Sequence, residues 1–442
     1  MHLQSPRPWR RVAPTACGLA LVALTTTAVP GGYGTASAAV PAAAPAAAAV
    51  DQPHILLGVT GGQLPVMTTD RLDRFEAKAE RTMATVRMYA LWDSAFPDTL
   101  STHAKDNGQT LVLSVRAKTK AGKAVPYTAI SGAAKGSAYY NRIVEWAQMV
   151  KAFEAPMFFT FQHEPEAAAN DVSGTAAQYK AAWQRIVTIF REQGVRNAEY
   201  TFIATAYGFR RMDKRHAGNY YPGDAYVDDI AADAYNWFTC RPGVQTAWAP
   251  PKPLLEPFRQ FGLKHPDKGL IIGELGTVED PQQPGRKAAW YREAADLLAQ
   301  PEYSQVRAVA EWYKAGDPGS CNWEIDTSAS SLDAFQAWAA DPRYSATSLV
   351  PSTPRQVLAK TGTTPRTAQV SWAPAGPGGS PVTGYTVTVA ETGETITLDG
   401  NQSSYVYQPA APTGSTYSFT VSATNATGTG GTSARTAAVA LR

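Results

Sequence analysis

The chain has 442 residues, of which 44% are hydrophobic and 17% charged. This length suits one large domain plus a small one, and the composition excludes collagen-like, coiled-coil and wholly disordered proteins. Three of the 40 basic residues (Arg7, Arg10 and Arg11) lie in a predicted leader, and the others balance the 37 acidic residues. We therefore expect no nucleic-acid or anionic-membrane partner, and a neutral substrate.

The first 38 residues have the three parts of a secretory signal peptide. They begin with basic residues, continue with an apolar run over 18–29 and end in the small residues 36–38. The apolar run is too short to remain as a membrane anchor, and Cys17 precedes it, unlike the cysteine of a lipoprotein signal. Residues 39–51 are rich in Ala and Pro and predict a spacer. We expect a secreted, extracellular protein, with no membrane association after cleavage.

Two cysteines, Cys240 and Cys321, follow the leader. In an oxidising compartment this pair favours a disulfide, and two buried free thiols are the alternative. The spacing matches neither a redox motif nor a metal site. The bond would join the loops after the sixth and eighth strands predicted below.

One theme repeats from residue 54 to residue 313: a short β-branched or aromatic run, a loop, and in most cases a helical pattern. The eight predicted strands are His54–Thr60, Thr85–Trp92, Thr110–Ala117, Met157–Glu164, Glu199–Tyr207, Asp228–Asn236, Gly269–Gly276 and Arg307–Tyr313. Helical patterns include Tyr139–Phe153, Ala176–Gln193 and Arg286–Gln300. Alternating strands and helices with eight repeats predict an α/β fold, a (β/α)8 TIM barrel over residues 52–345.

After a linker at 346–353, residues 354–442 predict a small all-β domain. Thr, Gly, Ser and Pro increase, helical periodicity ends, and turn residues separate short alternating runs. These runs are Ala368–Trp372, Gly384–Ala390, Thr395–Leu398, Tyr405–Gln408 and Tyr417–Ala423. The stretch Thr416–Asn425 resembles a fibronectin type III domain, an immunoglobulin-like sandwich. It contains no clustered titratable groups, so we expect it to act as a spacer or a weak glycan-binding module.

Two carboxylates stand at predicted strand ends on the face where barrel enzymes carry their active sites. Glu164 ends the fourth strand, and Glu274 lies within Ile-Ile-Gly-Glu-Leu-Gly of the seventh. A buried carboxylate is costly unless it has partners, so for Glu274 a structural ion pair with Arg87 or Arg116 is the alternative. Two carboxylates facing each other across a barrel mouth suit glycoside hydrolysis, in which one acts as an acid and the other as a nucleophile.

This arrangement resembles the clan A glycoside hydrolases, and His163 directly before Glu164 resembles glycoside hydrolase family 26, the β-mannanase and β-glycanase group. The resemblance spans residues 52–345. It implies that Glu164 is the general acid/base and Glu274 the nucleophile of a retaining double displacement that cleaves mannan or a related β-glycan. His163 would then position the sugar.

Two further positions agree with the resemblance. Asp233-Ala234-Tyr235 is similar to the family's Asp-x-Tyr, whose tyrosine hydrogen-bonds the nucleophile, and both ends of the motif are expected at the substrate site. Trp312, at the end of the eighth strand, would stack on the sugar ring. For His163, Tyr235 and Trp312, plain packing in the core is the alternative.

The loop after Glu164 departs from the mannanase pattern, because residues 165–170 contain no aromatic residue to stack on a sugar. Aromatic residues near other strand ends are candidate platforms: Trp92, Trp237, Phe238, Trp248, Tyr313 and Trp323.

Three other functions are the alternatives: a metal-dependent hydrolase using His163, Glu164 and Glu166, a non-catalytic carbohydrate-binding barrel, and an adhesion protein. The first lacks the usual metal-ligand spacing. We expect a monomeric glycosidase that needs no cofactor and no metal ion.

Overall fold

The computed structural model describes residues 55–61, 67–240, 247–315, 321–410 and 412–442. The predicted signal peptide and the whole of the predicted spacer lie outside these ranges, as does His54. No helix within the described ranges combines the length and the apolar character needed to cross a membrane.

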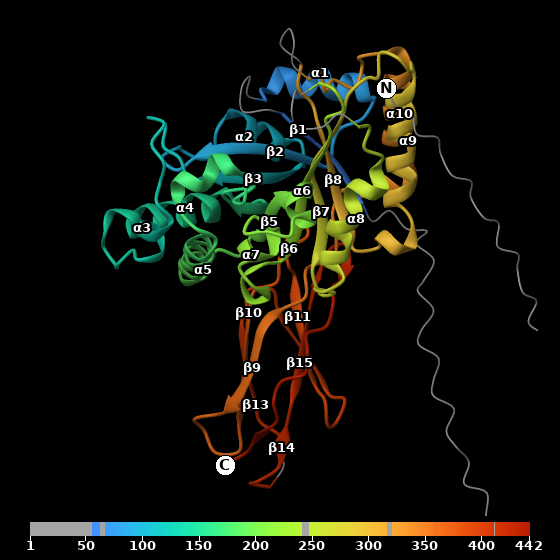
Figure 1. Cartoon of the computed structure of the whole chain (residues 1–442). Coiled ribbons are helices and arrows are strands. Elements are labelled where there is room, and N and C mark those ends of the chain that lie inside the picture. The colour runs from blue at the N-terminus through green and yellow to red at the C-terminus, as the bar shows by residue number, and fades with distance from the viewer. Residues whose placement is uncertain (1–54, 62–66, 241–246, 316–320, 411) are drawn as a thin grey trace, which may run out of the picture. The chain divides into compact units, whose positions relative to one another are not determined.

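Eight parallel strands close into a barrel in which each strand pairs with the next and β8 pairs with β1 (Figure 1). The strands are β1 (Leu56–Thr60), β2 (Thr85–Leu91), β3 (Thr110–Arg116), β4 (Met157–Phe161), β5 (Ala198–Thr205), β6 (Asp229–Asn236), β7 (Gly269–Thr277) and β8 (Val306–Trp312). The predicted TIM barrel is confirmed. Most ends agree within two residues, and β4 is shorter than predicted because the chain turns after Phe161.

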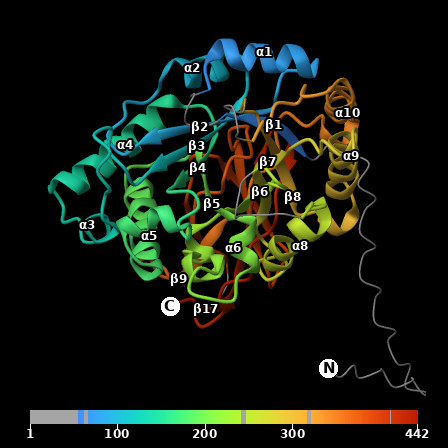
Figure 2. The same cartoon turned by 45° about the horizontal axis from the view of Figure 1, so that its top comes forward.

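Helices surround the barrel (Figure 2). They are α1 (Thr69–Ala79), α2 (Thr99–Asp106), α3 (Tyr127–Ser131), α4 (Ala138–Phe153), α5 (Ala176–Glu192), α6 (Ala206–Arg210), α7 (Ala217–Tyr220), α8 (Pro251–Gly262), α9 (Arg286–Leu298) and α10 (Ala329–Ala339). In α5, Thr175 and Gln178 form a capping box that starts the helix. Its residues Tyr179, Trp183 and Phe190 are buried, so this face packs on the barrel.

Apart from a buried ion pair network near the first residues of three strands, the barrel interior has an apolar layer that gives way to polar side chains at the carboxyl ends of the strands. A buried cluster near the start contains Leu56, Val112, Phe158, Ile203, Ala231, Ile271 and Ala308. Successive side chains alternate between the two faces of a strand, so residues two positions further along share this interior face. These positions include the polar residues Ser114 and Asp233. The polar side chains of the barrel interior therefore lie toward the carboxyl ends of the strands, where barrel enzymes have their active sites.

A buried ion pair network joins three strands near their first residues. Arg307 Nη1 on β8 lies 2.6 Å from Asp229 Oδ1 on β6 and 3.1 Å from Glu199 Oε2 on β5. The Asp229 and Glu199 side chains are almost completely buried. Burial raises the pKa of Glu199 well above its ordinary value, which favours its protonated form beside the Arg307–Asp229 ion pair.

The C-terminal segment forms antiparallel sheets, as predicted for a fibronectin type III domain. Its strands are β9 (Arg355–Thr361), β10 (Ala368–Ala373), β11 (Gly384–Val389), β12 (Thr395–Asp399), β13 (Ser404–Tyr407), β14 (Thr416–Tyr417), β15 (Phe419–Asn425), β16 (Gly428–Thr429) and β17 (Val439–Ala440). One sheet has the order β13-β10-β9 and another β12-β11-β15-β16. Alternate residues of β11 and β15 are buried around Trp372, which gives this domain its own core.

Candidate active site

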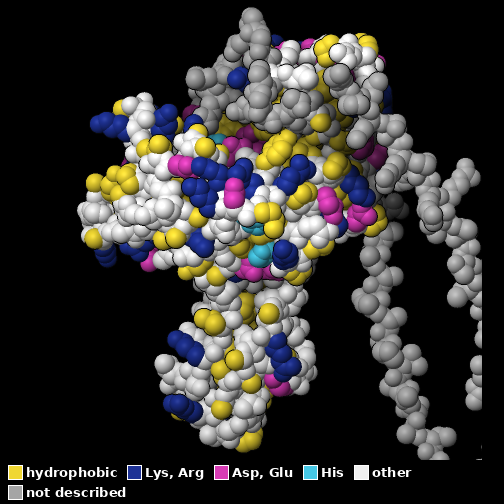
Figure 3. All heavy atoms as spheres, in the orientation of Figure 1, with side chains coloured by type: hydrophobic (Ala, Val, Ile, Leu, Met, Phe, Trp, Pro, Cys, Tyr) yellow, Lys and Arg dark blue, Asp and Glu magenta, His cyan; other side chains and the backbone are white. Residues whose placement is uncertain are grey.

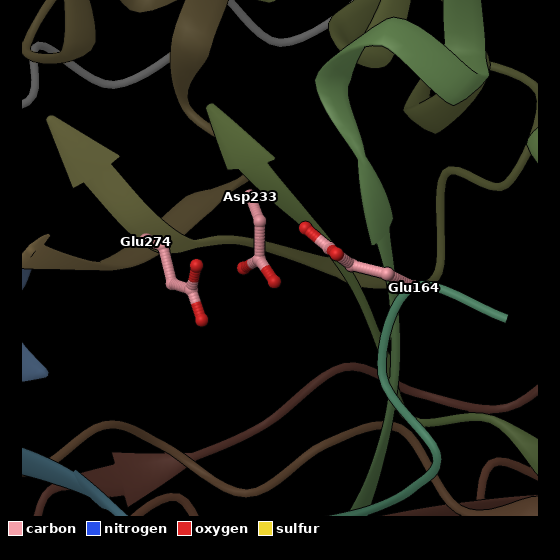
Figure 4. Close-up of side chains that lie close together, drawn as sticks. All are labelled: Glu164, Asp233 and Glu274. Atoms are coloured by element: carbon pink, nitrogen blue, oxygen red, sulfur yellow. The ribbon is translucent and has the colours of Figure 1, made fainter. Parts of the chain in front are cut away.

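Three carboxylates from three neighbouring parts of the barrel meet at the carboxyl ends of the strands (Figure 4). Glu164 follows β4, Asp233 lies on β6 and Glu274 on β7. One oxygen from each lies within 4.8 Å of one oxygen of both others. The two glutamates singled out from the sequence therefore face a common space.

Glu274 is held by two tyrosines. Tyr89 on β2 donates its hydroxyl hydrogen to Oε1, and Tyr235 on β6 donates to Oε2. Burial raises the pKa of Tyr235, and burial together with the Glu274 carboxylate raises that of Tyr89, so both hydroxyls remain protonated donors. These two contacts fix the plane of the carboxylate.

Arg87 joins the carboxylates of β6 and β7. Its guanidinium makes two hydrogen bonds to Asp233, of 2.7 and 3.3 Å, and lies 3.1 Å from Glu274 Oε1. Burial alone would lower the pKa of Arg87, but Asp233 and Glu274 raise it, so the guanidinium stays charged. The ion pair that was the alternative interpretation of Glu274 is therefore present, in addition to the carboxylate cluster. Asp233 is completely buried and its carboxylate contacts Arg87.

A β-bulge aims Glu274 into the barrel mouth. The register of β6 with β7 shifts so that Ala232 pairs with Ile272 and Asp233 with Glu274, which leaves Gly273 without an opposite residue. A Cβ atom on Gly273 would lie 2.7 Å from Asp233 Oδ1 and 2.9 Å from Arg87 Nη1. Only glycine leaves room there for the ion pair.

The short segment that contains Glu164 has an unusual backbone conformation. Gln162 and Glu164 both have a φ of 49°, in the left-handed region that non-glycine residues rarely adopt. Hydrogen bonds stabilise this turn: the Glu164 N–H donates to Ile203 O at 2.8 Å, and Asn170 Nδ2 donates to Glu164 O at 2.8 Å. Such strain persists where surrounding contacts fix it and is concentrated at functional sites.

The environment of Glu164 favours its protonated form. Burial raises its pKa well above the ordinary value of 4.5, and the nearby carboxylates of Asp233 and Glu274 raise it further. Glu164 is also partly exposed, whereas Glu274 is 5% exposed. The side chain that holds a proton is therefore also the one that reaches the cleft.

His163 and Trp312 border this carboxylate cluster. His163 is buried against the Tyr89 ring, with centroids 5.2 Å apart, and burial together with Arg87 and Arg116 lowers its pKa, so it is neutral. Trp312 is half-buried and meets Tyr235 edge to face at 5.8 Å. Trp312 thus presents part of its ring at the barrel mouth.

The predicted disulfide between Cys240 and Cys321 is confirmed, with Cα atoms 5.0 Å apart across a sequence separation of 81. It joins the segments after β6 and β8 and packs in a cluster with Tyr235, Trp312 and Trp323. Of the candidate sugar platforms, Trp92, Tyr313 and Trp323 are buried, and Trp237, Phe238 and Trp248 are half-buried.

Glu166, considered above as a metal ligand, bonds to the protein instead. Its Oε1 accepts hydrogen bonds of 2.7 Å from both the N–H and the hydroxyl of Thr205. Its backbone carbonyl accepts from Arg215 Nη1 at 2.7 Å. Glu166 thus holds the loop after Glu164 against the loop after β5.

Sequence reasoning missed Tyr89 and Gly273. Tyr89 stands two residues after Arg87 on β2, and strand alternation places both side chains on the interior face. This spacing of two residues was the signal in the sequence that could have placed Tyr89 beside Arg87 at the site. The role of Gly273 depends on a bulge, which no sequence pattern indicated.

Comparisons with known proteins show which families and solved structures this chain is similar to. The family model described as "Glycosyl hydrolase family 26" matches residues 71–242, and "Fibronectin type III domain" matches residues 352–439. Endoglucanase H of Acetivibrio thermocellus is 29% identical over 215 residues, which are 46% of this chain and 22% of the relative. The chain thus matches about a fifth of the length of that curated relative.

Two similar solved structures are bacterial mannanases. An endo-beta-1,4-mannanase double mutant from Cellulomonas fimi shows 20% identity and a TM-score of 0.48, covering 87% of this chain and 94% of that one. A GH26 beta-mannanase from Bacteroides ovatus shows 17% identity and a TM-score of 0.48, covering 66% and 90%. By its family-model matches, this chain carries a domain of glycosyl hydrolase family 26, followed by a fibronectin type III domain.

Proposed function

We propose that the protein hydrolyses a β-linked polysaccharide by a retaining double displacement, with Glu274 as nucleophile and Glu164 as general acid/base. The separation of the two carboxylates carries this proposal: their oxygens approach within 4.8 Å. Retaining glycosidases place their carboxyl groups about 5–5.5 Å apart, whereas inverting ones need roughly 6.5–9.5 Å to admit a water molecule.

The two environments supply the two roles. Glu164 keeps its proton because burial and neighbouring carboxylates raise its pKa, so it can protonate the leaving oxygen. Glu274 accepts hydrogen bonds from Tyr89 and Tyr235 and lies beside Arg87, and these three contacts hold its carboxylate in a fixed orientation for attack.

The reaction would proceed in two steps. As Glu164 transfers its proton to the glycosidic oxygen, a Glu274 oxygen bonds to the anomeric carbon and the leaving sugar departs. Glu164, now a carboxylate, then takes a proton from water, whose oxygen displaces Glu274. Trp312 would support the ring of the attacked sugar and His163 would orient it.

Mannan and related β-glycans are the substrates we propose, which fits the names of the endoglucanase and mannanases reported above. We further propose a monomer that is secreted, and the disulfide is of the kind that persists in oxidising compartments. Mass spectrometry of the protein from culture medium would test processing near residue 38, and light scattering would test the monomer.

The decisive experiment compares Glu274→Gln and Glu164→Ala with a matched control, Glu311→Gln. Glu311 is also a buried carboxylate, on β8, but it accepts a 2.6 Å hydrogen bond from Tyr291 on α9. We expect Glu274→Gln to remove nearly all turnover of mannan and mixed-linkage glucan. Glu164→Ala should retain activity on aryl glycosides whose leaving group needs little protonation. Glu311→Gln should retain activity on both substrate types.

NMR of the first-formed product checks the stereochemistry, since retention gives the β-anomer first. An α-anomer product would contradict the double displacement. Binding of polysaccharide without any hydrolysis, unchanged in Glu274→Gln, would instead support the non-catalytic carbohydrate-binding barrel.

A further inference from the structure

A cavity of about 370 Å3 lies beside the carboxylate cluster, between the ends of β2 and β3. Arg87 and Tyr89, which contact Glu274, line its inner end. Arg116, whose charge acts on Glu164, also lines it. A sugar next to the cleaved linkage would therefore extend into this cavity.

The cavity lining has more basic than acidic side chains, although the Arg87 guanidinium is already paired with Asp233 and Glu274. Its lining contains the basic residues Arg87, Arg116, Lys118 and Lys120 and a single acidic residue, Asp98. The Asp98 carboxylate caps α2 by accepting from Ser101 N at 2.8 Å. Of the carboxylates in the described part of the chain, none forms an ion pair with Lys118 or Lys120.

The turn that carries the two lysines is fixed in place. Lys118 pairs with Ala124 in a β-bridge, and Thr119 N donates to Lys123 O at 2.9 Å. The Asp93 carboxylate accepts the Lys120 backbone N–H at 2.7 Å and anchors the turn to the chain after β2. Figure 3 shows Lys and Arg side chains in dark blue at the upper left, where the chain after β3 projects.

We propose that this cavity is a subsite for an anionic sugar unit, whose carboxylate or sulfate group is bound by Lys118 and Lys120 with Arg116. The proposal rests on the hydrolase function argued above. To the neutral substrates expected from the sequence and proposed above, it adds a class of substrate: a β-glycan that carries a negative charge close to the cleaved linkage. Exposed ammonium groups next to a partly enclosed cavity attract such a group at long range, and raising the ionic strength screens the attraction.

Binding to Glu274→Gln tests the subsite without turnover. Calorimetric titrations use β-1,4-mannotetraose and β-1,4-glucotetraose, each neutral, oxidised to the uronate at C6, or sulfated at O6. In the Lys118→Gln/Lys120→Gln background, we expect the ratio of anionic to neutral association constants to fall about fivefold to tenfold. Lys123→Gln is the matched control, since Lys123 lies on the same turn and does not line the cavity.

The outcomes separate the two sources of charge. A fall confined to the oxidised sugars identifies a uronate subsite, and one confined to the sulfated sugars a sulfate subsite. Equal ratios in the double variant and its parent, an equal loss in Lys123→Gln, or no preference for any anionic probe would overturn the proposal. Because binding is measured here and hydrolysis is measured separately with neutral mannan and glucan, failure of one proposal is distinguishable from failure of the other.

Discussion

Gly273 offers a sharp test of how the site is built, because its missing side chain leaves room for a buried ion pair. In Gly273→Ala, the new Cβ would lie 2.7 Å from Asp233 Oδ1 and 2.9 Å from Arg87 Nη1, against an ordinary contact limit of 3.4 Å. The Asp233 carboxylate must therefore move by about 0.7 Å, or the bulge must shift Glu274 by a similar distance.

We expect a tenfold to hundredfold loss of kcat, since misplacing a reacting group by about 1 Å costs about a hundredfold. Overpacking should also lower the free energy of unfolding by about 1–3 kcal/mol. The assay pairs kcat on an aryl β-glycoside with urea unfolding followed by circular dichroism.

Gly262→Ala is a matched control. Its Cβ would also meet atoms at 2.7 Å, but these are the two terminal methyl carbons of Leu270, near the start of β7. We expect a similar loss of stability with kcat unchanged. If Gly273→Ala keeps the parent kcat, or loses activity only in proportion to the folded fraction, Gly273 does not position the carboxylates and the reasoning is refuted.

Three further predictions concern single groups. Tyr89→Phe removes a donor to Glu274 and should lower kcat about tenfold to hundredfold, with the circular dichroism spectrum unchanged; an unaltered kcat would contradict its positioning role. The raised pKa of Glu164 means that stability from its protonated form is lost as pH rises through the folded pKa, so the melting temperature of Glu164→Gln should increasingly exceed that of the parent over that range. A constant difference would exclude the raised pKa. Arg307→Ala leaves the buried Asp229 carboxylate without its ion-pair partner and should cost about 3–5 kcal/mol in urea unfolding, whereas Lys252→Ala, which removes an exposed pair with Glu302, should cost under about 1 kcal/mol; equal losses would contradict the buried network.

The barrel was predictable because hydrophobic runs of strand length alternate with helical patterns, and both depend on local sequence. The sandwich was predicted less completely. β9 was not expected, because the segment follows a proline and its sequence does not alternate apolar with polar residues, although the burial of its residues does alternate. The strand expected over Tyr417–Ala423 is interrupted at Ser418, whose N–H donates to Glu391 Oε2 at 2.9 Å instead of to a neighbouring strand.

The positions of Glu164 and Glu274 followed from their place at the ends of apolar strands. Their surroundings did not, because the contacts of Glu274 depend on the register of β2, β6 and β7 and on a bulge at Gly273. Register and bulges are set by packing across the whole barrel, which a local pattern does not encode.

The carboxylate network also means that the active site can form only when both halves of the barrel are folded together. Arg87 and Asp233 are 146 residues apart in sequence, and Tyr89 and Glu274 are 185 apart. A cut between β4 and β5 would leave Arg87, with Glu164, on one fragment and Asp233, with Glu274, on the other. Neither half would hold a working centre, so restored hydrolysis would report directly on reunion of the two half-barrels.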